Sequence, residues 1–496
     1  MAEERELKLE APPHFDAPDL SGVEEGISAG DPVENRITTH YWDTPDLRLA
    51  RWGTSLRHRS GEGWTVKLPP MMGQGVMVRE EQAFTGVPSH PPEGALDLLR
   101  AYVRTAELKP VASLRTRRRA VSLVDAGGEA QVEVVDDEVS VLDGRRIALR
   151  FRQVEVEVKS PTANGLVDSV VSRLREAGAG PVDPVPKNVR AMGPLSQSPP
   201  EVHAAAVDRD SSAATLLQAT IASAVARLIR NDPLIRLGGD SESVHQGRVA
   251  TRRLRSDLRT FKPMFDPEWA DSLRDELSWL GELLGDVRDA DILAERLAGQ
   301  LRQIARAGGN SRRLSRQLSA RRRGARVRLM SGLRSERYVL LLERLVKAAQ
   351  APALAEGATQ PAIEAMPPLV KRTWDRLASA VKKLDKTPAD EQLHAVRIAG
   401  KRVRYASEAV APVIGKPASR LAAGVTELQD TLGDYNDAVV TSAWLRGAVS
   451  DMEPSTAFIA GALSEKEEGT ARKSKAAWPA VWKRLSRKKM HQWMER

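Results

Sequence analysis

The sequence predicts an α+β protein with a strand-rich N-terminal part and an all-helical C-terminal part. Residues 1–192 hold segments in which apolar and polar residues alternate, such as ERELKLE, TSLRHR, GWTVKL, AQVEVV and QVEVEVK. A period of two is typical of half-buried strands. From about residue 209, Ala-, Leu- and Arg-rich segments with a period near 3.6 predict helices. At roughly 150 residues per domain, the 496 residues allow two to four domains.

The helical part is predicted to be a duplication. A Pro- and Ser-bearing linker, 193–208, precedes it, and a second linker at 350–368 divides it into portions of about 209–349 and 369–490. VHQGRVATRRLRS at 244–256 aligns with LHAVRIAGKRVRY at 393–405, and LLGDVRDAD at 283–291 aligns with TLGDYNDAV at 431–439. The simplest explanation is a repeated unit of about four helices.

Charge and composition narrow the classes of function. Residues 1–195 hold 25 basic and 30 acidic residues, whereas 196–496 hold 50 basic and 36 acidic residues, so the second part favours an anionic partner. The absence of cysteine excludes disulfides, thiolate metal sites and cysteine nucleophiles. No apolar run reaches membrane-spanning length, and the acidic start MAEERELKLE does not resemble a secretory signal. We therefore expect a cytoplasmic protein without a membrane partner.

Each repeated helix carries a stripe of basic residues. At 100° per residue, the first stripe falls within an arc of about 80°. Asp257 is the sole acid between 243 and 265, so few carboxylates can neutralise it. A solvated surface and a polyanion-binding surface both fit one such helix, but the recurrence of the spacing favours a polyanion, whose phosphates suit arginine forks. The two stripes with their neighbouring arginines are His245, Arg248, Arg252, Arg253, Arg255 and Arg259, then His394, Arg397, Lys401, Arg402 and Arg404.

The predicted strands also carry charged faces. Glu4, Glu6, Lys8 and Glu10 share one face of the first strand, and the 155–159 segment EVEVK repeats this pattern. In an open sheet such faces are merely solvated, whereas in a closed barrel they line a polar lumen. A lumen with carboxylates and many basic groups would hold a divalent cation together with phosphates.

These motifs resemble the CYTH domain of the triphosphate tunnel metalloenzymes. The signature E-x-E-x-K stands at residues 4–8, and YWDTPDLRLARWGTSLRHR (41–59), TVKL (65–68), VREE (78–81), LKPVASLRTRRR (108–119), VEVVDDEV (132–139) and FRQVEVEVK (151–159) follow in the family's order. The resemblance implies an eight-stranded antiparallel tunnel with flanking helices that binds triphosphate compounds with Mg²⁺ or Mn²⁺. Known members include inorganic triphosphatases, thiamine-triphosphatases and a class of adenylate cyclases.

The CYTH resemblance also implies roles for individual residues. Glu4, Glu6, Glu155 and Glu157 correspond to metal ligands, with Glu133 or Asp137 assisting. Glu4, Glu6, Lys8, Glu155 and Glu157 are the expected catalytic residues. The run 115–119 offers several registers, so the inward-facing arginines are open at this point. The expected phosphate-binding residues are Lys8, Arg57, Arg59, Lys67, Arg79, Arg117, Arg119 and Lys187.

Residues 208–490 resemble the CHAD domain through the two His/Arg helices and the two LGD segments. This resemblance implies a bundle with pseudo-twofold halves and a basic surface that binds inorganic polyphosphate. We therefore predict a metal-dependent triphosphatase fused to a polyphosphate-binding module, with polyphosphate granules as a candidate location. The alternatives are a non-catalytic polyphosphate-binding protein and, ranked lower, an adenylate cyclase. Nucleic acid is not the expected partner, because no aromatic side chains interleave with the arginines of the stripes.

Overall fold

The computed structural model describes residues 5–69, 71–73, 76–78, 80–160, 163–183, 185–239, 241–306, 311–449 and 453–495. The chain divides into two compact units, Met1–Glu201 and Val202–Arg496. The division falls inside the expected linker 193–208, but the segment before it packs on the first unit. Trp52 Nε1 donates a hydrogen bond of 2.9 Å to Glu201, and Arg104 forms an ion pair of 2.8 Å with the same carboxylate.

The first unit is built on one antiparallel sheet with short helices around it. The sheet follows the order β1-β11-β10-β9-β3-β4-β5-β8, with β2 added beside β9, and β6 and β7 form a separate hairpin. The strands are β1 (Arg5–Ala11), β2 (Ser28–Ala29), β3 (Val33–Asp43), β4 (Ser55–Arg59), β5 (Gly63–Lys67), β6 (Met71–Gly73), β7 (Val76–Val78), β8 (Glu81–Phe84), β9 (Lys109–Val124), β10 (Ala130–Asp143) and β11 (Arg146–Val158). The helices are α1 (Arg48–Arg51), α2 (Glu93–Val103), α3 (Asn164–Glu176) and α4 (Lys187–Met192).

Alternation along the strands separates an apolar face from a charged face. Leu9, Val134 and Val156 point to a core that α3 covers with Val170 and Leu174. The residues between them in β1, β10 and β11 point to the opposite side. The period-two pattern therefore predicts these faces correctly.

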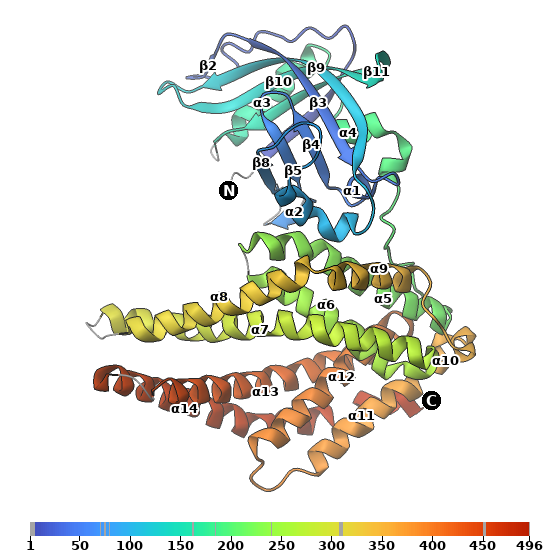
Figure 1. Cartoon of the computed structure of the whole chain (residues 1–496), viewed down its shortest axis with the longest axis vertical. Coiled ribbons are helices and arrows are strands. Elements are labelled where there is room, and N and C mark those ends of the chain that lie inside the picture. The colour runs from blue at the N-terminus through green and yellow to red at the C-terminus, as the bar shows by residue number, and fades with distance from the viewer. Residues whose placement is uncertain are drawn as a thin grey trace. The chain divides into compact units, whose positions relative to one another are not determined.

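The sheet is strongly curved (Figure 1). Residues of β1 and β5, near opposite ends of the strand order, line one cavity together with residues of β9 and β11. Within the described residues β1 and β8 are not hydrogen-bonded to each other. The predicted eight-stranded antiparallel sheet is confirmed, and of the two arrangements that the alternation allowed, the charged face lines a lumen.

The second unit is helical. Ser212 caps the first helix, α5, through a hydrogen bond of 3.2 Å from the Thr215 N–H, and Gly238 ends it with a left-handed φ of 75°. The helices are α5 (Ala213–Leu237), α6 (Ser241–Thr260), α7 (Pro267–Arg306), α8 (Arg312–Arg334), α9 (Glu336–Gln350), α10 (Ala362–Ala365), α11 (Pro367–Lys382), α12 (Asp390–Ile414), α13 (Lys416–Ala448), α14 (Pro454–Leu485) and α15 (Lys488–His491). None of the described helices is long and apolar enough to cross a membrane.

The helical unit has two layers that follow the predicted repeat. Helices α5–α9 form one layer and α11–α14 the other, with α7 and α8 lying along α13 and α14 (Figure 1). Leucines such as Leu297, Leu318, Leu445 and Leu463 join these four helices in one apolar cluster. The helices with the basic stripes, α6 and α12, pack against each other. The duplicated halves therefore bring the two stripes together.

Candidate functional site

The first unit contains a charged cavity on the concave face of the sheet. Its volume is about 160 Å³, and it is lined almost entirely by polar groups. Most lining residues come from strands, whereas three come from the segment that begins α4. The lining residues are Glu6, Lys8, Tyr41, Ser55, Arg57, Arg59, Lys67, Arg118, Glu155, Glu157, Pro186, Lys187 and Asn188.

Three of these carboxylates form an acidic triad, Glu6, Glu155 and Glu157. In the β1–β11 register Glu6 lies opposite Glu157, and Lys8 lies opposite Glu155, so all of them face the same side. One carboxylate oxygen of each triad member lies within 4.8 Å of the others. Ligand oxygens around an octahedral ion with bonds of about 2.1 Å lie about 3 to 4.2 Å apart. The triad therefore fits a hard divalent cation such as Mg²⁺ or Mn²⁺ after a small inward movement.

Basic groups hold Glu155, the most buried member of the triad, in its ionised form. Burial would raise the pKa of Glu155, but Lys187 and Lys8 outweigh burial and lower it. Lys187 Nζ lies 2.9 Å from the Glu155 carboxylate. Burial would likewise lower the pKa of Lys187, yet Glu155 and Asp137 raise it. Lys8 forms an ion pair with Glu6. The cavity therefore presents charged carboxylates and charged ammonium groups side by side.

The two acids expected to assist at the metal are paired with basic groups instead. Asp137 is fully buried and accepts hydrogen bonds of 2.9 and 2.7 Å from Arg118, and it also pairs with Lys187. Glu133 lies 2.9 Å from Lys159, which also contacts Glu157 at 2.6 Å. Neither acid is among the three whose oxygens converge within 4.8 Å, and their expected part in metal binding stays a prediction.

Arg118 is the cavity residue that the sequence interpretation missed, and Arg117 and Arg119 do not line the cavity. Arg117 points to the other side of β9, where it lies 3.2 Å from Glu34. Side chains alternate along a strand, so Arg117 and Arg119 point to the side opposite to Arg118. In the β9–β10 register Arg118 lies opposite Asp137, with which it pairs. The sequence did not show which set of the run 115–119 faces inward, because the run offers arginines on both sides of the strand.

The far wall of the cavity carries three of the expected phosphate-binding residues, Arg57, Arg59 and Lys67. Arg57 interacts with Tyr41, and its Nε, like that of Arg59, is buried without a hydrogen-bond partner among the described residues. Lys67 pairs with Glu81. Unpartnered guanidinium N–H groups in a polar cavity are suited to phosphate oxygens. The predicted residues Glu4 and Arg79 lie outside the described residues.

The helical unit holds a second group of cations, which we call the shared cluster: Arg248 and Arg252 from α6, and Arg397 and Lys401 from α12. Arg248 and Arg397 occupy equivalent positions of the repeat, as do Arg252 and Lys401. Burial, Arg397, Arg252 and Arg248 together lower the pKa of Lys401 to about 7. The Nε atoms of Arg252 and Arg397 are buried without a hydrogen-bond partner among the described residues. A bound anion would accept hydrogen bonds from these Nε–H groups and would stabilise the charged form of Lys401.

The glycines of the two LGD segments lie against this cluster. A Cβ at Gly285 would meet the Arg248 guanidinium at 3.7 Å, and one at Gly433 would meet Arg397 at 3.9 Å. A longer side chain would therefore displace the guanidinium. Arg248 also pairs with Asp289 at 2.7 Å. Asp286 and Asp291 pair with Arg328 and Arg322 of α8, so all three aspartates take part in ion pairs between helices.

The other predicted stripe residues lie around the shared cluster. The pKa of His245 is lowered, mainly by burial and to a smaller extent by Arg288. The equivalent His394 has its Nδ1 atom 3.0 Å from the side-chain oxygen of Asn436. Arg253 and Arg404 both contact Glu408, at 2.9 and 3.4 Å. Three stripe residues lie elsewhere: Arg259 and Arg402 both interact with Arg274 and Arg376, and Arg255 interacts with Arg259.

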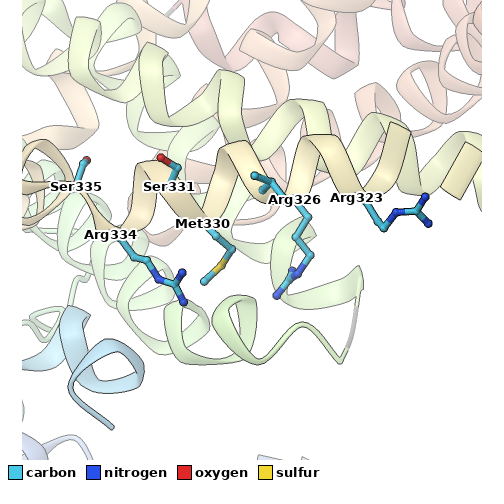
Figure 2. Close-up of a pocket in the computed structure, with 7 residues that line it drawn as sticks. Arg323, Arg326, Met330, Ser331, Arg334 and Ser335 are labelled. Atoms are coloured by element: carbon cyan, nitrogen blue, oxygen red, sulfur yellow. The ribbon is translucent and has the colours of Figure 1, made fainter. Parts of the chain in front are cut away.

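A hollow beside α8 contributes no comparable chemistry. Its volume is about 720 Å³, and its lining residues all belong to α8 or directly follow it. Figure 2 shows Arg323, Arg326, Met330 and Arg334 along this helix. Arg326 donates hydrogen bonds of 2.7 and 3.1 Å to the carbonyls of Ile235 and Arg236, which end α5. Its side chain therefore stabilises a helix terminus.

Comparisons with known proteins agree with the two units. The family model described as CYTH domain matches residues 2–187, and the one described as CHAD domain matches residues 219–446. Two curated relatives are "Uncharacterized protein Rv2226" of Mycobacterium tuberculosis (strain ATCC 25618 / H37Rv) and "Uncharacterized protein MT2285" of Mycobacterium tuberculosis (strain CDC 1551 / Oshkosh). Each is 29% identical over 445 residues, which cover 84% of this chain and 84% of the relative.

Two solved structures are also similar. PptA from Streptomyces chartreusis is 23% identical with a TM-score of 0.47, and the match covers 55% of this chain and 100% of that chain. The CHAD domain from the plant Ricinus communis is 26% identical with a TM-score of 0.47, and the match covers 57% of this chain and 95% of that chain.

Proposed function

Because the chain consists of a CYTH domain followed by a CHAD domain, we propose that it is a divalent-metal-dependent triphosphatase with a polyphosphate-binding helical unit. The observation that carries the proposal is the cavity of the first unit. The acidic triad and the cations Lys8, Arg57, Arg59 and Lys67 line the same space of about 160 Å³. A site for metal and triphosphate needs both charge types within a few ångström of each other.

The proposed substrate is inorganic triphosphate or short polyphosphate. Arg57 and Arg59 offer unpartnered N–H groups to the phosphate oxygens and hold the chain in place. Water attacks a terminal phosphorus, the bond to the bridging oxygen breaks, and triphosphate yields orthophosphate and diphosphate. A divalent ion held by the triad supplies positive charge that offsets the charge developing on the phosphate oxygens.

The helical unit is proposed to bind longer inorganic polyphosphate through the shared cluster. Four cations from two helices face one another there, and Lys401 loses much of its charge at neutral pH without an anion. A polyphosphate chain supplies closely spaced negative charges along its length, and arginine forks bind such oxygens bidentately. This unit would keep the enzyme on long chains or on polyphosphate granules.

A phosphate-release screen tests the enzyme proposal. The full chain is incubated with Mg²⁺ or Mn²⁺ and with tripolyphosphate, long-chain polyphosphate, ATP or thiamine triphosphate. We expect orthophosphate from tripolyphosphate, and no release from the Glu6→Ala variant. Polyphosphate binding without turnover of any triphosphate would instead identify a non-catalytic polyphosphate-binding protein. Cyclic AMP formed from ATP, without orthophosphate, would identify a cyclase.

A further inference from the structure

The packing of α6 on α12 creates two junctions at equivalent positions of the repeat. His245 corresponds to His394, and the same offset of 149 residues relates Arg253 to Arg402 and Arg259 to Glu408. At one junction Arg253 of α6 meets Glu408 of α12 at 2.9 Å. At the other junction, the same contact with the helices exchanged relates Arg402 of α12 to Arg259 of α6. These two helices pack against each other, and Arg259 lowers the pKa of Arg402. The acid of the first junction is thus an arginine in the second.

Arginines from two further helices increase the difference in charge between the two junctions. Helix α11 contacts both α6 and α12, and α7 contacts α6. Arg376 of α11 and Arg274 of α7 both lower the pKa of Arg259 and of Arg402. The residue equivalent to Arg376 is Arg227 of α5, which lines a hollow of about 360 Å³ with Arg253 and Glu408. One junction is therefore neutralised by a carboxylate, whereas the other gathers arginines from four helices. We call Arg259, Arg274, Arg376 and Arg402 the one-sided cluster.

The one-sided cluster has little internal compensation. Burial and the neighbouring arginines together lower the pKa of both Arg259 and Arg402. Arg274 pairs with Asp271 at 2.8 Å, but Lys262 shares this carboxylate. Among the described residues, Arg259, Arg376 and Arg402 have no ion pair. Since the equivalent junction folds with an ion pair in this place, packing alone does not require four arginines here.

We propose that the one-sided cluster is an additional anion site that holds phosphoryl groups of a polyphosphate chain on one half of the helical unit only. The guanidinium groups of Arg259 and Arg402 can form forks to phosphate oxygens. No aromatic side chain belongs to the cluster, so bases have nothing to stack on. Arg252, Arg255 and Arg259 follow one another along α6 and connect the shared cluster to this site. A chain bound at the shared cluster therefore continues toward α11 and not toward the equivalent position beside α5.

This inference rests on the proposed binding of polyphosphate, and the variant Arg259→Glu tests it in the full chain. The substitution copies the Arg253–Glu408 pair onto the other junction, so we expect the fold to be retained. Affinity for long-chain polyphosphate should fall about tenfold to a hundredfold, because two charge-assisted contacts are lost. The dependence of log K on log salt should also become less steep.

A matched pair of variants checks which half is used. Arg376→Gln should weaken binding of long-chain polyphosphate, whereas Arg227→Gln, at the equivalent position, should bind it as the unaltered protein does. Tripolyphosphate and ATP serve as second and third ligands. Stronger effects of Arg376→Gln on ATP than on polyphosphate would overturn the assignment to inorganic chains. Thermal unfolding of each variant serves as the folding control.

The outcomes separate this inference from the proposed function. If the unaltered protein binds no polyphosphate, the proposed role of the helical unit fails, and the one-sided site fails with it. If the unaltered protein binds polyphosphate and Arg259→Glu binds it equally well, only the one-sided site is overturned. Equal losses in Arg376→Gln and Arg227→Gln would overturn it as well, because binding would then use both halves.

Discussion

The charged cavity of the first unit and the shared cluster of the helical unit are both rich in cations, but they differ in their carboxylates. In the cavity Glu6, Glu155 and Glu157 lie among the lysines and arginines, and their oxygens converge within 4.8 Å. In the shared cluster Arg248 pairs with Asp289, but no ion pair is found for Arg252, Arg397 or Lys401 among the described residues, and the pKa of Lys401 falls to about 7. We therefore expect the cavity to bind a metal ion together with a phosphate chain, and the shared cluster to bind a phosphate chain alone.

This difference teaches that basic residues alone do not distinguish turnover from binding in this chain. The cavity compensates its own charges, as the pairs of Lys187 with Glu155 and Asp137 show. In the shared cluster only Arg248 has an ion pair among the described residues, so a ligand would neutralise the other three cations. Variants that remove carboxylates from the cavity, or cations from the shared cluster, should therefore separate hydrolysis from polyphosphate binding.

The largest effect is expected from Glu155→Gln. It keeps the shape of a buried triad member but removes its charge, so phosphate release from tripolyphosphate should fall about 100-fold or more. Polyphosphate binding by the helical unit should be unchanged. The control is Glu138→Gln, because Glu138 is exposed on the opposite face of β10. Equal activity of the two variants would contradict a role for the triad.

The next largest effect on hydrolysis is expected at Arg118, and its neighbour Arg117 provides the comparison. Arg118→Gln should lower kcat/KM for tripolyphosphate about tenfold to a hundredfold, because a charged donor leaves the cavity. Arg117→Gln should have little effect, because Arg117 lies on the other face of β9 and pairs with Glu34. Steady-state phosphate release measures both. The opposite ranking would contradict the placement of Arg118 on the cavity face of β9.

A smaller effect is expected at the shared cluster. The double variant Arg252→Gln and Lys401→Gln should weaken binding of long-chain polyphosphate about tenfold, since two cations are lost. Hydrolysis of tripolyphosphate should continue at the normal rate, because these residues belong to the other unit. Titration calorimetry and the phosphate assay measure the two quantities. A loss of hydrolysis with intact binding would break the proposed division of roles.

The smallest effect concerns pH. Lys401 faces Arg248 and Arg252 from α6, Arg397 on its own helix and Asp437 from α13, and its pKa is about 7. A bound polyanion favours the charged form, so binding takes up a proton and weakens as pH rises above about 7. We expect a loss of up to about tenfold per pH unit until the pKa of the bound form is reached. Lys401→Arg should remove this dependence, because arginine stays charged.

Much of the site could be predicted from local patterns. Alternation in ERELKLE and QVEVEVK placed Glu6, Lys8, Glu155 and Glu157 on the charged faces of their strands, and they line the cavity. The repeated spacing of the His/Arg helices likewise predicted the pairs Arg248 with Arg397 and Arg252 with Lys401. A side chain's face depends on its own strand or helix, so these inferences need no knowledge of the neighbours.

The sequence by itself determined the division into a strand-rich and a duplicated helical part, together with the charged faces of their elements. The tertiary structure decided which charges meet. The pairing of β9 with β10 set Arg118 against Asp137, and Arg117 lies on the other side of β9 beside Glu34. The packing of α6 on α12 set Arg253 against Glu408 but Arg259 against Arg402. Periodicity reports the direction of a side chain from its own element, whereas register and helix packing choose its partner on another element.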